Sequence, residues 1–137
     1  ALMKRWSATA LAGLALFSTQ GSAEAGIRDE AVHFQKGSSQ ATIKGRIKGY
    51  ETIDFHLGAK AGQTMVVIFK PSNLSAYFNV LPAGEEDALF VGSSSGNRFS
   101  GVLPKDGDYR VRVYLRRNAA RRNESSSYSI TFRISGG

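Results

Sequence analysis

Six arginines lie within thirteen consecutive positions and form the densest charge feature of the sequence. No acidic residue interrupts them, and they are Arg110, Arg112, Arg116, Arg117, Arg121 and Arg122. The planar guanidinium group donates paired hydrogen bonds that suit carboxylates and phosphates. The cluster therefore predicts an anion-binding surface. A solvated strand face followed by a basic loop is the alternative that the same residues allow.

Nucleic acid is one anion that such a surface would attract. The chain has 137 residues and a net charge of +7, from 18 Lys and Arg against 11 Asp and Glu. The sequence contains no helix-turn-helix, zinc-finger or RNA-binding aromatic motif. A basic patch alone is weak support for nucleic-acid binding, so we expect no nucleic-acid partner.

Catalysis and metal binding find little support in the residue types. Asp54 and His56 suggest two members of a catalytic triad, but they lie two apart on an expected strand, and no Gly-x-Ser-x-Gly motif supplies a nucleophile. The chain has no Cys and two His, which excludes thiol chemistry and His-rich zinc sites. The acidic run from Glu85 to Asp87 matches no calcium-loop spacing. We therefore expect no enzyme, no metal site and no cofactor.

The first 25 residues have the pattern of a secretory signal peptide. Lys4 and Arg5 precede an apolar run over residues 8–17, and Ala23-Glu24-Ala25 has the form of an A-x-A cleavage site. A run this short does not cross a membrane, because a spanning helix needs about 20 apolar residues. We expect cleavage after Ala25, so that residues 26–137 form one periplasmic domain with no membrane attachment.

The remainder reads as short strands separated by turns. Apolar and polar residues alternate over Asp108 to Leu115 and Ser127 to Ile134, which indicates strands with one buried face. Residues 53–57 alternate in the same way, and residues 63–70 contain the apolar run of a more buried strand. Weaker strand candidates are residues 31–36, 42–48, 76–81, 89–91 and 98–103. This pattern predicts an all-β fold, an antiparallel β-sandwich of about eight short strands.

Two segments between the expected strands stand out. Arg116 to Asn123 lacks strand character, which leaves either a helical turn or an ordered loop. Tyr50 follows Gly49 where two expected strands meet. An aromatic residue at such a junction either packs against the turn or serves as a recognition anchor, and the sequence leaves both open.

Several motifs, taken in order, resemble the periplasmic inhibitors of goose-type (g-type) lysozyme. The motifs are Phe34-x-Lys36-Gly37-Ser38-Ser39, Gly45-x-Ile47-Lys48-Gly49-Tyr50, Ala59-Lys60-Ala61-Gly62-Gln63, Leu103-Pro104-x-x-Gly107-x-Tyr109-x-x-Arg112-Val113 and Arg117-Asn118-x-Ala120-Arg121. The resemblance extends from about Val32 to Ile134. The Lys-Gly-Tyr and Arg-Asn-x-Ala-Arg pieces are its most specific parts. The central stretch from Asn73 to Arg98 departs most from the pattern.

This resemblance implies a β-sandwich that blocks the lysozyme active-site cleft. It also implies that Tyr50, Arg117 and Arg121 enter the cleft, with Asn118 between the arginines as a further contact. A lysozyme cleft contains a catalytic carboxylic acid, and an inserted guanidinium is able to pair with it. The expected partner is thus a g-type lysozyme, of the host or of the bacterium itself.

A second interpretation keeps the fold and changes the function. The Ala-Gly-Gln and Leu-Pro-x-x-Gly-x-Tyr pieces also resemble the bacterial pre-peptidase C-terminal domain, a β-sandwich attached to secreted proteases. The alternative is therefore a non-enzymatic periplasmic binding module for an envelope glycan or protein.

Overall fold

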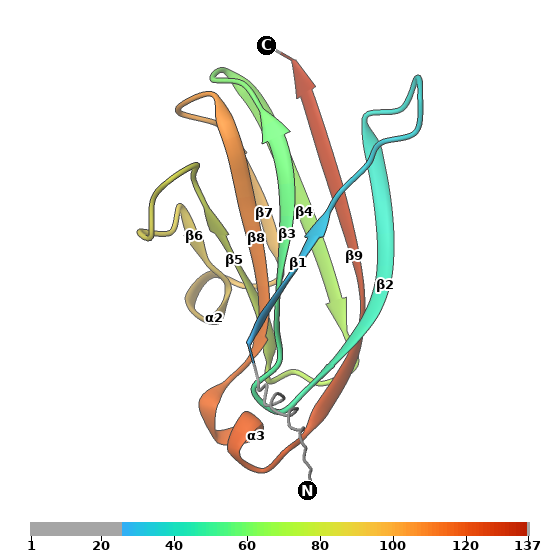
Figure 1. Cartoon of the computed structure of the whole chain (residues 1–137), viewed down its shortest axis with the longest axis vertical. Helices are drawn as coiled ribbons and strands as arrows, with labels where there is room; N and C mark the ends of the chain where they lie inside the picture. Colours follow the sequence, from blue (N-terminus) through green and yellow to red (C-terminus); the bar gives the residue numbers. More distant parts are fainter. Residues whose placement is uncertain (1–25, 137) are drawn as a thin grey trace, which may run out of the picture.

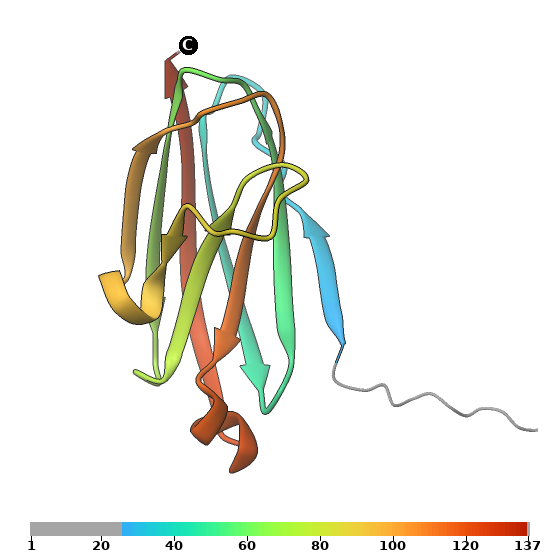
Figure 2. The same ribbon diagram turned by 90° about the vertical axis from the view of Figure 1, so that its left-hand side faces the viewer.

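A computed structural model of the chain describes residues 26–136, which form two β-sheets packed face to face (Figures 1 and 2). The signal peptide predicted for residues 1–25 lies outside these residues. The strands are β1 (Ile27–Ala31), β2 (Gln40–Lys48), β3 (Thr52–Ala59), β4 (Gln63–Pro71), β5 (Ala76–Leu81), β6 (Phe90–Val91), β7 (Arg98–Val102), β8 (Gly107–Leu115) and β9 (Ser125–Gly136). Two short helices, α2 (Gly92–Ser95) and α3 (Arg117–Arg121), interrupt them.

The two sheets confirm the predicted β-sandwich. One sheet has five strands in the order β1-β3-β8-β5-β6, and the other has four in the order β2-β9-β4-β7. All pairings are antiparallel except that between β1 and β3, which is parallel and aligns Ile27 with Thr52. The fold is thus mainly antiparallel, with one parallel strand added at an edge.

Alternating apolar residues from both sheets fill the space between them. On β8 the buried residues are Tyr109, Val111, Val113 and Leu115, as the alternation predicts. On β9 they are Tyr128, Ile130, Phe132 and Ile134. The apolar run in β4 is buried at Met65, Val66 and Val67, because β9 and β7 flank this strand on both sides. Each residue of this kind stabilises the fold by about 1.5–3 kcal/mol when fully buried.

The strand expected at residues 31–36 is misplaced. The first strand is instead β1, which ends at Ala31, and all five of its residues are exposed. Val32 and Phe34 are partly buried against the core while His33 is exposed, so the alternation in this segment reflects burial without strand pairing. No helix within residues 26–136 is long and apolar enough to span a membrane.

Candidate functional site

Three connections meet at one end of the sandwich (Figure 1). They are the turn between β2 and β3, the loop between β4 and β5, and the segment between β8 and β9 that contains α3. The turn carries Tyr50, and α3 carries Arg117, Asn118 and Arg121. The fold therefore brings all four predicted site residues to the same end, although about 70 positions of sequence separate Tyr50 from α3.

Residues 116–123, for which the sequence allows either a helical turn or an ordered loop, contain the helical turn α3. Ala119 and Ala120 are buried and fasten its inner side to the core. The Ala120 amide donates to the Arg116 carbonyl at 2.9 Å. The segment ends at Asn123, whose positive φ of 58° is a left-handed conformation that Asn tolerates better than most residues. These contacts leave the polar side chains of α3 on the exposed side.

The turn that carries Tyr50 rests directly on the chain that leaves α3. The Gly49 amide donates to the Glu124 carbonyl at 2.8 Å, and Gly49 has a φ of +63°. A Cβ atom at this position would lie 2.7 Å from Oδ1 of Asn123. The left-handed conformation favours glycine at this position, and the close contact leaves little room for a side chain. Tyr50 projects from this fixed turn with 54% of its surface exposed.

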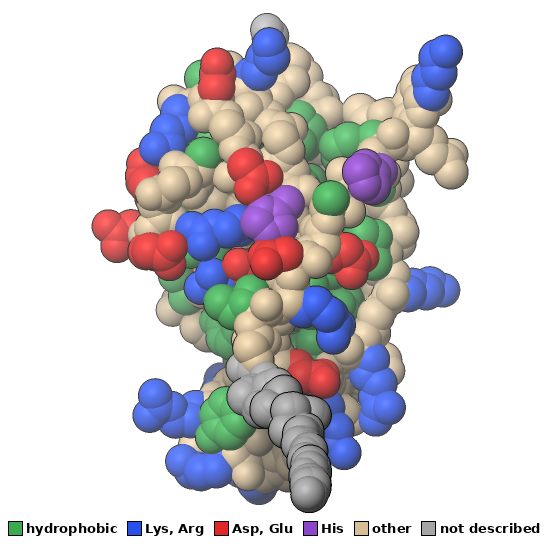
Figure 3. Space-filling view, in the orientation of Figure 1, with side chains coloured by type: hydrophobic (Ala, Val, Ile, Leu, Met, Phe, Trp, Pro, Cys, Tyr) green, Lys and Arg blue, Asp and Glu red, His purple; other side chains and the backbone are tan. Residues whose placement is uncertain are grey.

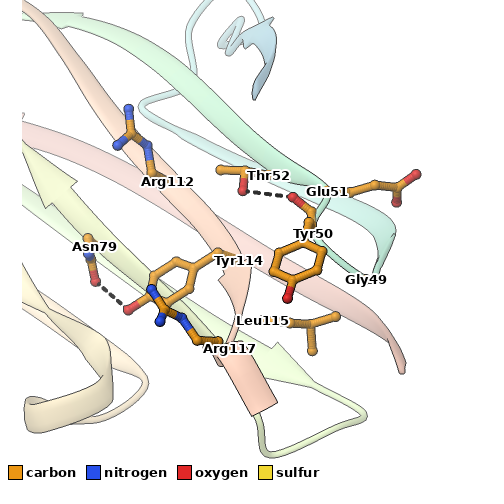
Figure 4. Close-up of a pocket in the computed structure, with 9 residues that line it drawn as sticks. All are labelled: Gly49, Tyr50, Glu51, Thr52, Asn79, Arg112, Tyr114, Leu115 and Arg117. Atoms are coloured by element: carbon orange, nitrogen blue, oxygen red, sulfur yellow. Dashed lines mark hydrogen bonds between the residues drawn. The ribbon is translucent and has the colours of Figure 1, made fainter. Parts of the chain in front are cut away.

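Tyr50 and Arg117 line one open groove of about 470 Å³ (Figure 4). The groove also involves Gly49, Glu51, Thr52, Asn79, Arg112, Tyr114 and Leu115. The hydroxyl of Tyr114 donates to Oδ1 of Asn79 at 3.1 Å and so fixes the ring on one wall. The site is therefore a groove with aromatic, amide and cationic groups, open to a partner at the end of the sandwich.

Asn118 and Arg121 lie outside this groove. Nη2 of Arg121 donates to Oδ1 of Asn118 at 3.1 Å, and both residues are exposed on α3. Arg117 thus lines the groove, whereas Arg121 pairs with Asn118. One end of the molecule presents the four residues as two adjacent groups.

Sequence reasoning missed Asn79, Arg112 and Tyr114 as groove residues. Arg112 and Tyr114 occupy the outward positions of the β8 alternation, so their exposure to the outer face was readable. Asn79 lies on β5, and its place opposite Arg112 follows from the register between β5 and β8. No pattern in the sequence indicates that register.

The arginine cluster divides into separately paired groups. Arg112 donates from Nε and Nη2 to the two oxygens of Asp54, at 2.7 and 3.0 Å, and this pair raises the pKa of the guanidinium. Arg110 pairs with Glu86 at 3.2 Å, and Arg122 pairs with Glu124 at 2.7 Å. The guanidinium of Arg116 lies 5.3 Å from the centre of the Tyr77 ring, a cation–π contact. These arginines therefore do not form a single continuous anion-binding patch.

The outer face of the five-stranded sheet carries a cluster of charged residues (Figure 3). His56 lies between two carboxylates, with Nδ1 2.6 Å from Asp108 and Nε2 2.7 Å from Asp29. Hydrogen bonds to Asp108 and then to Asp29 raise the pKa of His56. Asp54 faces Arg112 instead, so the structure does not pair Asp54 with His56. Within residues 26–136, no group of three or more His, Asp or Glu side chains is placed to hold a metal ion.

Comparisons with known proteins identify relatives of this chain in sequence and in structure. No protein-family model matches the sequence. The inhibitor of g-type lysozyme of Escherichia coli strain K12 is 32% identical over 108 residues, which cover 75% of this chain and 78% of that protein. The crystal structure of Aeromonas hydrophila PliG, described as a periplasmic inhibitor of g-type lysozyme, aligns with a TM-score of 0.73 and 37% identity. That alignment covers 80% of this chain and 97% of PliG.

A more distant likeness bears on the fold alone. The pre-peptidase C-terminal domain of a Bacillus anthracis collagenase aligns with a TM-score of 0.56 over 80% of this chain and 97% of that domain, at 15% identity. The sandwich architecture is thus shared more widely than any one function. The sequence identity to the Escherichia coli inhibitor, 32%, is about twice that to the collagenase domain. This match shows that the chain belongs to the family of g-type lysozyme inhibitors.

Proposed function

We propose that this protein inhibits g-type lysozyme in the bacterial periplasm by placing Tyr50, Arg117, Asn118 and Arg121 against the active-site cleft of the enzyme. One observation carries the proposal. An exposed aromatic side chain and an exposed arginine, Tyr50 and Arg117, line the same open groove, beside the paired Asn118 and Arg121 on α3. The protein acts in this role as a stoichiometric binder and not as an enzyme.

The chemistry of the target explains why these residue types are effective. Glycosidic bond cleavage by such enzymes uses carboxylic acid side chains in the cleft. A guanidinium inserted there pairs with a carboxylate and occupies the space of the substrate. Among the arginines of the cluster, Arg110, Arg112 and Arg122 already pair with carboxylates of their own chain. The guanidinium of Arg116 is engaged with the ring and the hydroxyl of Tyr77. Arg117 and Arg121 are therefore the better suited to pair with a carboxylate of the enzyme.

The rigid mounting of these residues favours tight binding. Gly49 and Asn123 fix the turn of Tyr50 against the chain that follows α3, and the buried alanines fix α3 itself. Ordering flexible side chains and loops on binding costs free energy, and a preformed surface avoids part of that cost. An aromatic anchor beside an arginine is also the composition typical of binding hot spots.

The test is lysis of peptidoglycan by g-type lysozyme, with and without an equimolar amount of the protein that spans residues 26–137. Hen-type lysozyme is assayed in parallel. We expect the parent protein to suppress lysis by the g-type enzyme. Arg117→Ala should weaken binding about 100-fold, which corresponds to ~2.8 kcal/mol and lies within the ~2–5 kcal/mol typical of truncating one partner of a buried charge pair.

Matched variants separate the site from the general basic charge of the protein. Tyr50→Ala, Arg121→Ala and Asn118→Ala probe the other three residues. Arg98→Ala removes one positive charge from β7, the edge strand of the four-stranded sheet, and should leave inhibition unchanged. Full lysis at micromolar parent protein contradicts the proposal. Binding to peptidoglycan in the absence of lysozyme supports the alternative, a binding module for envelope glycan.

A further inference from the structure

Leu74 is the most exposed large hydrophobic residue within residues 26–136, with 80% of its surface accessible. It lies in the loop between β4 and β5, at the same end of the sandwich as Tyr50 and α3. Exposing a leucine to water in this way gives the folded protein no burial free energy. A binding role would account for its presence, provided that the loop holds it in a defined position.

The loop is held by a dense set of hydrogen bonds. The backbone amide of Ser72 donates to the Ser127 carbonyl at 2.8 Å, and the Ser127 amide donates to Oγ of Ser72 at 3.0 Å. The Asn73 amide nitrogen donates to Oγ of Ser126 at 3.1 Å, and the Ser75 amide donates to Oδ1 of Asn73 at 2.9 Å. The polar groups on both sides of Leu74 are thus engaged within the protein. The leucine side chain projects into solvent from this fixed loop.

Glu124 connects this loop to the turn that carries Tyr50. Its carboxylate accepts a hydrogen bond from Nδ2 of Asn73 at 3.0 Å, and its carbonyl accepts one from the Gly49 amide at 2.8 Å. The hydrogen bond from Asn73, followed by that from Arg122, lowers the pKa of Glu124, so the carboxylate stays charged at neutral pH. A single residue therefore helps to position both exposed hydrophobic side chains.

The two connections flank α3. In Figure 2 the loop between β4 and β5 and the turn between β2 and β3 lie on opposite sides of α3, which extends beyond the ends of the strands. A cleft that closes around α3 would meet Tyr50 on one side and the β4–β5 loop on the other. This arrangement distinguishes Leu74 from Val102, an exposed aliphatic residue at the far end of β7.

We propose that Leu74 is a second anchor for g-type lysozyme, one that packs on an apolar surface at the rim of the cleft opposite the Tyr50 contact. The inference rests on the proposed function and extends it to a residue outside the arginine and tyrosine cluster. The enzyme molecule that contacts Leu74 is the same one that binds Arg117. The contact is apolar, so it contributes to affinity without depending on the charge of the partner.

The experiment measures the constants with which three variants of the protein inhibit g-type lysozyme. The variants are Leu74→Ser, Leu74→Met and Val102→Ser. Leu74→Ser should bind about tenfold more weakly, the loss expected for a hot-spot residue of moderate strength. Leu74→Met should inhibit like the parent, because methionine offers a similar apolar surface. Val102→Ser, which removes an aliphatic side chain that is 69% exposed at the opposite end, should also inhibit like the parent.

The outcomes separate this inference from the proposed function. Thermal midpoints of the variants should match the parent, since both side chains are exposed. Unchanged inhibition by Leu74→Ser, together with weakened inhibition by Arg117→Ala, would overturn the role of Leu74 and leave the proposed function standing. Equal weakening by Leu74→Ser and Val102→Ser would also overturn it. A parent protein that fails to inhibit overturns both.

Discussion

The guanidinium of Arg112 grips the carboxylate of Asp54 with two hydrogen bonds, from Nε at 2.7 Å and from Nη2 at 3.0 Å. Asp54 is only 3% exposed although it lies on the outer face of its sheet, because Arg112 covers it. Arg112 also lines the groove beside Tyr50 and Arg117. The pair therefore serves the fold and shapes one wall of the candidate site.

Removing Arg112 should destabilise the protein. Arg112→Ala removes the two charge-assisted hydrogen bonds to Asp54 and the side chain that covers it, and we expect a loss of about 2–3 kcal/mol in the free energy of unfolding. Arg110→Ala is the matched control on the same strand, because Glu86, its carboxylate partner, is mostly exposed. That variant should lose about 1 kcal/mol or less. Urea unfolding measures both, and equal losses would contradict the special role of the Asp54 pair.

The stability of the fold should depend on pH through His56. A neutral imidazole has one N–H, yet both ring nitrogens of His56 face carboxylates, so the protonated form is favoured and its pKa is raised. The stabilisation is present in full below the ordinary pKa of 6.5 and is lost as the pH rises through the raised value in the folded protein. His56→Gln, which has no charge to lose, should lack this dependence.

Urea unfolding of the parent and of His56→Gln from about pH 5.5 to about pH 8.5 tests this linkage. The difference in unfolding free energy between the two proteins should shrink as the pH rises. A constant difference across the range would refute the linkage. NMR titration of the His56 ring measures the pKa directly, and Asp29→Asn should lower it by removing one of the two carboxylates.

Glycine at position 49 should be required for inhibition as well as for stability. Gly49→Ala places a side chain in a left-handed conformation and 2.7 Å from Oδ1 of Asn123, so the strained turn that carries Tyr50 or the Asn123 side chain that lies against it must shift. Gly62→Ala adds a methyl group at a φ of +88° with no atom within 4 Å. Both variants should lose about 1–2 kcal/mol of stability from backbone strain. Only Gly49→Ala should weaken inhibition of g-type lysozyme, and equal inhibition by both would disprove the positioning role.

The salt dependence of the complex should be shallow. The chain carries a net charge of +7, and many lysozymes are basic too, so long-range attraction contributes little to association. In the proposed complex, affinity rests instead on buried contacts of Tyr50 and Arg117, which salt screens only weakly. Inhibition constants measured from about 50 mM to about 500 mM sodium chloride should change by less than tenfold. A steep loss of affinity would point to a diffuse basic patch.

Part of this fold was readable from alternation alone. The buried apolar positions of β3, β8 and β9 follow a period of two because successive side chains of a strand point to opposite faces. The same rule failed for β1, since all five of its residues are exposed and leave no pattern. That strand lies at the edge of its sheet and is placed by its parallel pairing with β3, which is a contact distant in sequence.

The candidate site was readable to a similar extent. The motifs that resemble the inhibitor family select Tyr50, Arg117, Asn118 and Arg121, and the lack of strand character over residues 116–123 is consistent with α3. The sequence did not reveal which arginines are already paired. Asp54 lies 58 positions from Arg112, and Asn73 lies 51 positions from Glu124. Such partners are decided by strand register and loop packing.

The amino-acid sequence by itself thus determined the buried apolar positions of β3, β8 and β9, most of the places where strands give way to turns, and the family that the chain resembles. These properties depend on local periodicity and on short motifs, both of which are visible along the chain. Only the tertiary structure decided that Tyr50 and Arg117 share a groove, that Arg121 turns to Asn118, and that Leu74 lies at the same end. Those relationships arise because the packing of two sheets brings distant connections together, and no local pattern encodes the distance between them.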